Sequence, residues 1–191
     1  MQIFNSPTRY GAVAQSLHWF AVALVILAWV LGVSDDILPK GPARATGLHI
    51  HIIAGMLVIV VTIVRLLYRT ADPSPPAEST EPGGGSFAGW IGLGAKLAHV
   101  GLYALLFAVP LVGIAVQFAR GDALPVFGLF DIASPWPADR AFARSLKEIH
   151  EVLAHGLLLL AGLHAAAALL HHWVFRDRTL ARMLPGSDAD R

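Results

Sequence analysis

The sequence predicts an all-α membrane protein, a transmembrane four-helix bundle in which every helix crosses the bilayer. Only 14% of its 191 residues are charged and 55% are apolar, and its mean hydropathy is +0.61, whereas a soluble domain carries about 25% charged residues. Four long stretches contain no Asp, Glu, Lys or Arg. Because about 20 mostly apolar residues cross a bilayer as a helix, each stretch is long enough to span. We expect a single membrane domain over residues 1–191, with spans at about 10–34, 45–64, 97–119 and 152–175.

The first span has an apolar region longer than that of a signal peptide, so we expect it to stay in the mature protein. The connector at 70–94 is rich in Pro, Gly and Ser, and its first half is predicted to be irregular and solvated. The connector at 120–151 carries turn-forming Gly and Pro residues, then a helix-competent stretch from Ala138 that continues into the fourth span.

The distribution of basic residues predicts the orientation. The N-terminal tail, the second connector and the C-terminal tail hold eight Lys and Arg residues, against six in the other two connectors. Because basic residues favour the cytoplasmic side, both termini are predicted to lie in the cytoplasm. A net charge of +1 argues against nucleic acid as a partner, and the absence of Cys excludes disulfides, thiolate metal sites and thioether-attached haem.

Histidines carry the chemistry that the sequence offers. Ionisable residues are costly inside membrane spans, so a set of this size needs a functional explanation. All nine lie inside or within two residues of an apolar span: His18, His49, His51, His99, His150, His155, His164, His171 and His172.

Helical spacing arranges four of these histidines into two pairs. His150 and His164 are 14 residues apart, so they share a face of one helix at a separation of roughly 21 Å. Helices that alternate in direction then match His18 in depth with His164, and His51 with His150. We call these the inner pair and the outer pair, after the predicted orientation.

Two neutral imidazoles at each of two levels, without thiolates, favour low-spin b-type haem. The predicted bundle therefore encloses two haem b groups, whose iron ligands are His18, His51, His150 and His164. A zinc or copper ion is the alternative to haem. A tetrahedral zinc ion, however, needs four protein ligands at one level, and each level here offers two histidines.

Three further positions are open to two interpretations each. Arg65 lies 14 residues after His51, on the same face but at the inner level, where it pairs with a haem propionate or anchors the helix at the surface. His171, seven residues after His164, exchanges protons with quinone or lies at the headgroups. His49 competes with His51 as the outer ligand, because a register shift of two residues near a helix start is easily misjudged.

In combination these motifs resemble the bacterial cytochrome b561 family of small di-haem membrane proteins. The resemblance runs from about residue 10 to 185. It rests on the ordered set LHW at 17–19, His51 followed by Gly55 and RLLYR at 65–69, HVGLYALL and PLVG within 99–113, HEVLAHGLLLLAGLHAAAALLHHW at 150–173, and RDRTLARMLP at 176–185.

The resemblance implies a multi-pass protein of the bacterial inner membrane, with axial ligands at the positions of the two pairs. It also implies electron exchange with quinone, and in one branch the oxidation of superoxide at the outer surface with ubiquinone as acceptor. We therefore expect an oxidoreductase of the superoxide:ubiquinone type, in which electrons enter at the outer pair and leave to quinone near His171.

The outer connectors carry charges of both signs, so their sequence does not decide whether they attract superoxide. The cations that would draw it are Lys40, Arg44, Arg144 and Lys147, and the same surface carries Asp35, Asp36, Asp139 and Glu148. Two alternative functions stay open: a haem b subunit that takes electrons from a hydrogenase or dehydrogenase partner, and, in a different class, a histidine-lined metal transporter.

Overall fold

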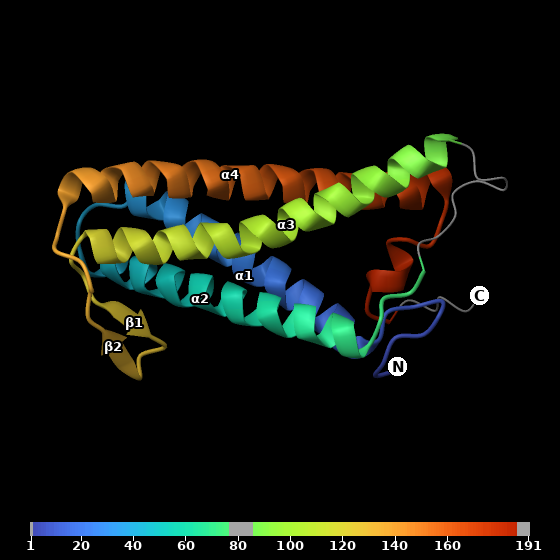
Figure 1. The fold of residues 1–191 in the computed structure, drawn as a ribbon, viewed down its shortest axis with the longest axis horizontal. Helices are drawn as coiled ribbons and strands as arrows, with labels where there is room; N and C mark the ends of the chain where they lie inside the picture. The colour runs from blue at the N-terminus through green and yellow to red at the C-terminus, as the bar shows by residue number, and fades with distance from the viewer. Residues whose placement is uncertain (1, 77–85, 187–191) are drawn as a thin grey trace. The chain divides into compact units, whose positions relative to one another are not determined.

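The computed structural model describes residues 2–76 and 86–186. Helices make up most of this chain, and a short antiparallel hairpin interrupts them (Figure 1). The elements are α1 (Ala12–Ile37), α2 (Pro42–Ala71), α3 (Ser86–Ala119), β1 (Leu124–Val126), β2 (Phe130–Ile132), α4 (Arg140–Leu170), the π-helical turn η1 (His171–Phe175) and the 3₁₀ turn η2 (Ala181–Met183).

The predicted fold class is confirmed. Within the described residues, four segments are long and apolar enough to cross a bilayer: Ala12–Asp35, Pro42–Ala71, Gly89–Ala119 and Arg140–Phe175. Helices α2, α3 and α4 extend beyond the charge-free stretches, because Arg and Lys side chains near a helix end reach the interface without breaking the helix. Helix α4 begins at Arg140, where the Asp139 carboxylate accepts hydrogen bonds from the backbone N–H groups of Ala141 (2.9 Å) and Phe142 (3.0 Å) and caps the helix.

The two long connectors contain regular structure that their sequence-based description did not include. Residues 77–85 of the Pro/Gly/Ser-rich connector lie outside the described residues, and helix α3 already begins at Ser86. The connector between α3 and α4 contains the β1–β2 hairpin, which the sequence analysis missed. Its turn places Phe127 (φ 52°) and Gly128 (φ 71°) in the left-handed region, as the two central positions of a tight hairpin turn require.

The chain divides into two compact units, and each contains segments of all four helices. The first unit consists of Met1–Trp19, Ile63–Tyr103 and Leu158–Arg191, and the second of Phe20–Thr62 and Ala104–Leu157. The inner pair falls in the first unit and the outer pair in the second. That the whole chain behaves as a single membrane domain stays a prediction.

Hydrogen bonds hold the two chain ends together in the first unit. The Arg182 guanidinium donates to the carbonyl oxygens of Pro7 (2.9 Å), Thr8 (2.8 Å) and Pro76 (2.9 Å), and Arg9 donates to the carbonyl oxygen of Leu184 (3.0 Å). These hydrogen bonds therefore tie the N-terminal segment to the turns after α4 within the first unit (Figure 1).

Candidate functional site

The outer pair is formed by His51 of α2 and His150 of α4, whose ring centroids lie 5.9 Å apart with the ring planes at 76°. The Nδ1 atom of His51 is 2.7 Å from the carbonyl oxygen of Ala28, and Nδ1 of His150 is 2.9 Å from that of Val109. Because a carbonyl oxygen only accepts, both Nδ1 atoms carry the proton, and each Nε2 keeps its lone pair. Both imidazoles are thereby prepared to bind a metal through Nε2.

Two glycines face these imidazoles from the other helices. A Cβ at Gly32 of α1 would stand 3.1 Å from Cε1 of His51, and a Cβ at Gly113 of α3 would stand 3.0 Å from Cε1 of His150. Both distances are shorter than ordinary van der Waals contact. The missing side chains therefore let the backbones of α1 and α3 approach the outer pair.

The inner pair consists of His18 of α1 and His164 of α4, with ring centroids 6.5 Å apart and ring planes at 66°. Arg65 of α2 reaches this pair: its Nη2 atom donates a hydrogen bond to Nδ1 of His18 at 3.2 Å. The same guanidinium lies over the ring of Tyr103, 5.7 Å from its centroid, in a cation–π contact. Arg65 is therefore an integral part of the inner site.

A third imidazole, which sequence reasoning left without a role, lies at the inner pair. His99 of α3 has its ring centroid 5.2 Å from that of His164, and its Nδ1 atom donates to the carbonyl oxygen of Ala95 at 2.7 Å. Its placement inside an apolar span and at the start of HVGLYALL was the signal available in the sequence, and spacing offered no partner on α3 itself. The inner site thus collects side chains from all four helices.

The ring separations of both pairs fit haem iron, but the two pairs differ in proton position. At the inner pair Nδ1 of His18 accepts from Arg65, so iron binding through Nε2 of His18 requires this hydrogen bond to be released and Nε2 to lose its proton. Two imidazoles that bind one iron from opposite sides are expected to have centroids roughly 6 Å apart, since each metal–nitrogen bond is about 2 Å long. Among residues 2–76 and 86–186, no three His, Cys, Asp or Glu side chains are grouped as ligands of one metal ion. Paired imidazoles suit the two axial positions of a haem better than the four positions of a zinc ion.

Comparison with known proteins decides the family. The sequence model described as prokaryotic cytochrome b561 matches residues 9–186, nearly the whole chain. The chain belongs to the prokaryotic cytochrome b561 family. It is therefore a membrane cytochrome b, and membership implies that it binds haem b.

Three relatives show how far the likeness to other b561 proteins extends. Cytochrome b561 homolog 2 of Escherichia coli K12 is 31% identical over 198 residues, covering 100% of this chain and 98% of the relative. The probable superoxide oxidase CybB of Yersinia pestis is 33% identical over 181 residues, covering 93% and 96%. Cytochrome b562 of Cereibacter sphaeroides is 28% identical over 180 residues, covering 92% and 94%.

A second feature of this b561 protein is a cavity of about 410 Å³ in the second unit. Four basic side chains and one acidic side chain line it. Arg120, which sequence analysis passed over, is one of them, whereas Arg144 is not. The signal for Arg120 was its place directly after the third charge-free stretch. The lining residues are Asp35, Lys40, Gly41, Arg44, Ala45, Leu48, Arg120 and Lys147.

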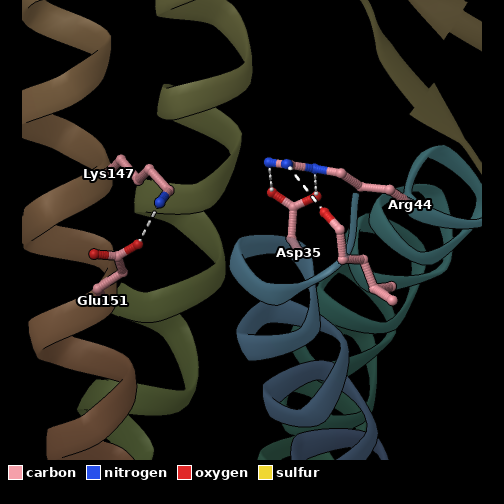
Figure 2. A network of polar contacts seen from close by, with 5 residues as sticks. Asp35, Arg44, Lys147 and Glu151 are labelled. Atoms are coloured by element: carbon pink, nitrogen blue, oxygen red, sulfur yellow. Dashed lines mark hydrogen bonds and ion pairs between the residues drawn. The ribbon is translucent and has the colours of Figure 1, made fainter. Parts of the chain in front are cut away.

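Ion pairs fix two of the cations at this cavity, as Figure 2 shows. The Arg44 guanidinium binds both carboxylate oxygens of Asp35, at 2.9 and 3.0 Å, and Lys147 contacts Glu151 at 2.7 Å one turn along α4. A two-point Arg–carboxylate contact holds the guanidinium plane in one orientation. Two of the four cations that line the cavity are therefore held in place by ion pairs.

The third feature lies where α4 ends in the first unit. Nδ1 of His171 forms a short hydrogen bond with Oδ2 of Asp177, a residue that sequence analysis did not single out. Burial alone raises the pKa of Asp177, but the hydrogen bonds from His171 and Thr179 outweigh it and hold the pKa below its ordinary value. A carboxylate that is ionised at neutral pH therefore faces the His171 imidazole.

The remaining histidines lie away from both pairs. His49 is exposed, and the ring that meets His150 is that of His51. His155 is exposed and bonds the carbonyl oxygen of Glu151 at 2.7 Å, while His172 is exposed beside Trp173. Gly55 of α2, one turn after His51, faces Pro110 of α3, because a Cβ at position 55 would lie 3.7 Å from that proline.

Proposed function

We propose that this protein is a di-haem cytochrome b that transfers electrons from superoxide, at the outer side of the membrane, to ubiquinone at the inner side. His51 and His150 would hold one haem, and His18 and His164 the other, with Arg65 beside the inner haem as partner of a propionate. Haem b, when bound, supplies a one-electron carrier at each pair. Both termini face the cytoplasm of a bacterium in this proposal, and the membrane is the inner membrane.

The observation that carries the proposal is the position of the cation-lined cavity relative to the outer pair. Leu48 and Lys147, which line the cavity, each precede a histidine of the pair by three residues on the same helix. Three residues are nearly one helical turn, so on each of these two helices a residue that lines the cavity lies about 4.5 Å along the axis from a histidine of the pair. Four cations line the cavity, and two of them are paired with Asp35 and Glu151, so the place keeps a net positive charge that favours a small anion arriving from water.

The overall reaction balances with two protons taken from water at the quinone side. Two superoxide ions each give up one electron and leave as O₂, and one quinone takes both electrons and two protons to become quinol. A group that moves protons is therefore needed at the quinone side. His171 supplies one, because an imidazole both donates and accepts a proton near neutral pH.

Purified full-length protein in vesicles that contain ubiquinone tests the proposal. Superoxide generated in the buffer should be consumed with a stoichiometry of two per quinol formed, and the rate should fall as ionic strength rises, because salt screens the cations.

Lys40→Gln and Arg120→Gln should each lower the rate constant for superoxide roughly threefold or more. Arg144→Gln is the matched control, since Arg144 is exposed but does not line the cavity. Equal rates in all three variants would contradict a role of the cavity.

One observation favours a second candidate, a haem b subunit that accepts electrons from a docked redox protein. The hairpin between α3 and α4 exposes large apolar side chains, with Leu129 80% and Phe130 58% exposed. Exposed apolar surface of this kind occurs where proteins dock. Purification from its own membranes in a mild detergent separates the two candidates, because a stable large redox subunit would accompany the protein in the second. A protein without haem absorption would favour the metal transporter.

A further inference from the structure

The chain reverses direction directly after α4, and this reversal brings Asp177 against His171. The last turn widens into the π-helical turn His171–Phe175, and Arg176 then takes a left-handed conformation with φ 53°. The backbone N–H of Asp177 donates to the carbonyl oxygen of His171 at 3.1 Å and closes the reversal. Turns of this π-helical kind are rare and are frequently found at functional sites.

The two carboxylate oxygens of Asp177 have separate partners. Oδ1 accepts a hydrogen bond from the backbone N–H of Thr179 at 2.9 Å, which stabilises the turn, and Oδ2 binds Nδ1 of His171. The side chains of His171 and Asp177 are 19% and 9% exposed. The ring of Phe175 contacts the imidazole at a centroid distance of 5.1 Å. The imidazole is therefore held on two sides, by a carboxylate and by an aromatic ring.

We infer that Asp177 is a positioning residue that holds His171 with its proton on Nδ1 and presents Nε2 as the atom that exchanges protons with quinone. This inference rests on the proposed function, because it assigns a second residue to the same quinone site. A carboxylate only accepts a hydrogen bond, so neutral His171 must donate through Nδ1 and keep its lone pair on Nε2.

The proton steps follow from this arrangement. When quinol gives up its two electrons, it also releases two protons, and Nε2 accepts them one after the other from the quinol hydroxyls and passes each to water. In the opposite direction, Nε2–H of the imidazolium protonates the reduced quinone oxygen, and water reprotonates His171. Asp177 keeps its charge throughout and transfers no proton, as in other pairs of carboxylate and catalytic histidine.

The variant Asp177→Asn separates this role from a structural one. The asparagine has a single oxygen, which can keep the hydrogen bond from Thr179, so the turn is retained. Its amide NH₂ then faces Nδ1 of His171, which must accept, and the imidazole proton moves to Nε2. An imidazole protonated on Nε2 cannot take a proton from quinol there. Asp139→Asn is the matched control, because asparagine caps a helix as well as aspartate does.

Two measurements on the full-length, haem-loaded protein test the inference. Nitrogen NMR of ¹⁵N-histidine protein, with His171 assigned by the spectrum of His171→Gln, should show the proton on Nδ1 in wild type and on Nε2 in Asp177→Asn. Rapid mixing with decylubiquinol should show haem reduction slowed about tenfold or more in Asp177→Asn, with the haem spectrum unchanged, whereas Asp139→Asn should match wild type. Asp177→Glu, which keeps the carboxylate, should recover most of the rate.

The possible failures are distinguishable. A wild-type protein whose His171 carries its proton on Nε2 overturns the inference whatever the variants do, and so does an Asp177→Asn protein that reacts as fast as wild type. If decylubiquinol reduces the haems of wild type and His171→Gln equally fast, the quinone site itself is elsewhere and the proposed role of His171 fails as well. Slowing by His171→Gln without slowing by Asp177→Asn refutes only the role of Asp177.

Discussion

The backbone of Gly113 on α3 lies against the imidazole of His150 on α4, so closely that a Cβ at position 113 would stand 3.0 Å from Cε1. On its Nδ1 side, the same ring is held by the carbonyl oxygen of Val109, 2.9 Å away and one turn before Gly113 on α3. One turn of a single helix thus sets both the proton position and the orientation of His150.

This contact predicts the effect of Gly113→Ala. The added methyl group should rotate or displace the His150 ring at a cost of roughly 1–3 kcal/mol, which corresponds to about a fivefold to 150-fold loss of affinity for the outer haem. Haem titration of the apoprotein, followed in the Soret region, measures the affinity. Gly94→Ala on the same helix is the control, since a Cβ there meets no described atom within 4 Å. Equal affinities in both variants would show that the close approach does not matter.

The number and attachment of the haems can be counted directly. Two histidine pairs and no Cys predict two non-covalent haem b groups per chain. Acid acetone should extract all of the haem, and the pyridine haemochrome assay should give two haems per polypeptide. A count of one, or haem that resists extraction, would contradict the assignment.

Single alanine variants test the assignment of ligands to pairs. His18→Ala and His164→Ala should each remove the inner haem, and His51→Ala and His150→Ala the outer one, because each pair shares one iron. Potentiometric titration separates two haems that differ in potential and shows which of them is lost. His49→Ala serves as control and should keep both haems. Loss of the outer haem in that variant would move the ligand from His51 to His49.

The proposed pairing of Arg65 with the inner haem predicts a shift in redox potential. Arg65→Gln removes a positive charge that favours the reduced state, so the potential of the inner haem should fall by roughly 50 mV while that of the outer haem stays unchanged. A redox titration monitored by absorption measures both. Arg69→Gln, in the last turn of α2, is the control for a basic residue that anchors the helix end. The same small shift in both variants would assign Arg65 to anchoring alone.

Local properties of the sequence were sufficient to predict the helices and the two histidine pairs. Spans follow from hydropathy, which depends on the transfer of each side chain into lipid and needs no knowledge of its neighbours. Depth follows from the fixed rise of a helix, so the 14-residue interval between His150 and His164 placed them at different levels. The alternating direction of the helices then matched His18 with His164 and His51 with His150. In the structure the two rings of each pair lie next to each other.

Tertiary structure decided which atoms surround those imidazoles. The bond from His51 to the carbonyl oxygen of Ala28 joins residues 23 apart, and that from His150 to Val109 joins residues 41 apart. Such contacts depend on how each helix is rotated about its axis, and periodicity fixes this rotation only to within a residue or so. His99 was overlooked for the same reason, because its neighbour His164 comes from another helix.

The segments outside the spans were the least determined by sequence. The β1–β2 hairpin and the return of Asp177 onto His171 both depend on residues in the left-handed region, Phe127 and Arg176, which are not glycines and give no local signal. Arg120 lines the cavity and Arg144 does not, because the packing of three helices and their connectors determines which charges converge.

The sequence by itself therefore determined the membrane topology and the ligand histidines that we propose, since both follow from hydropathy and helical rise. Only the folded chain decided the proton positions, the cation cavity and the partner of His171, since these arise from contacts between segments that are distant in sequence.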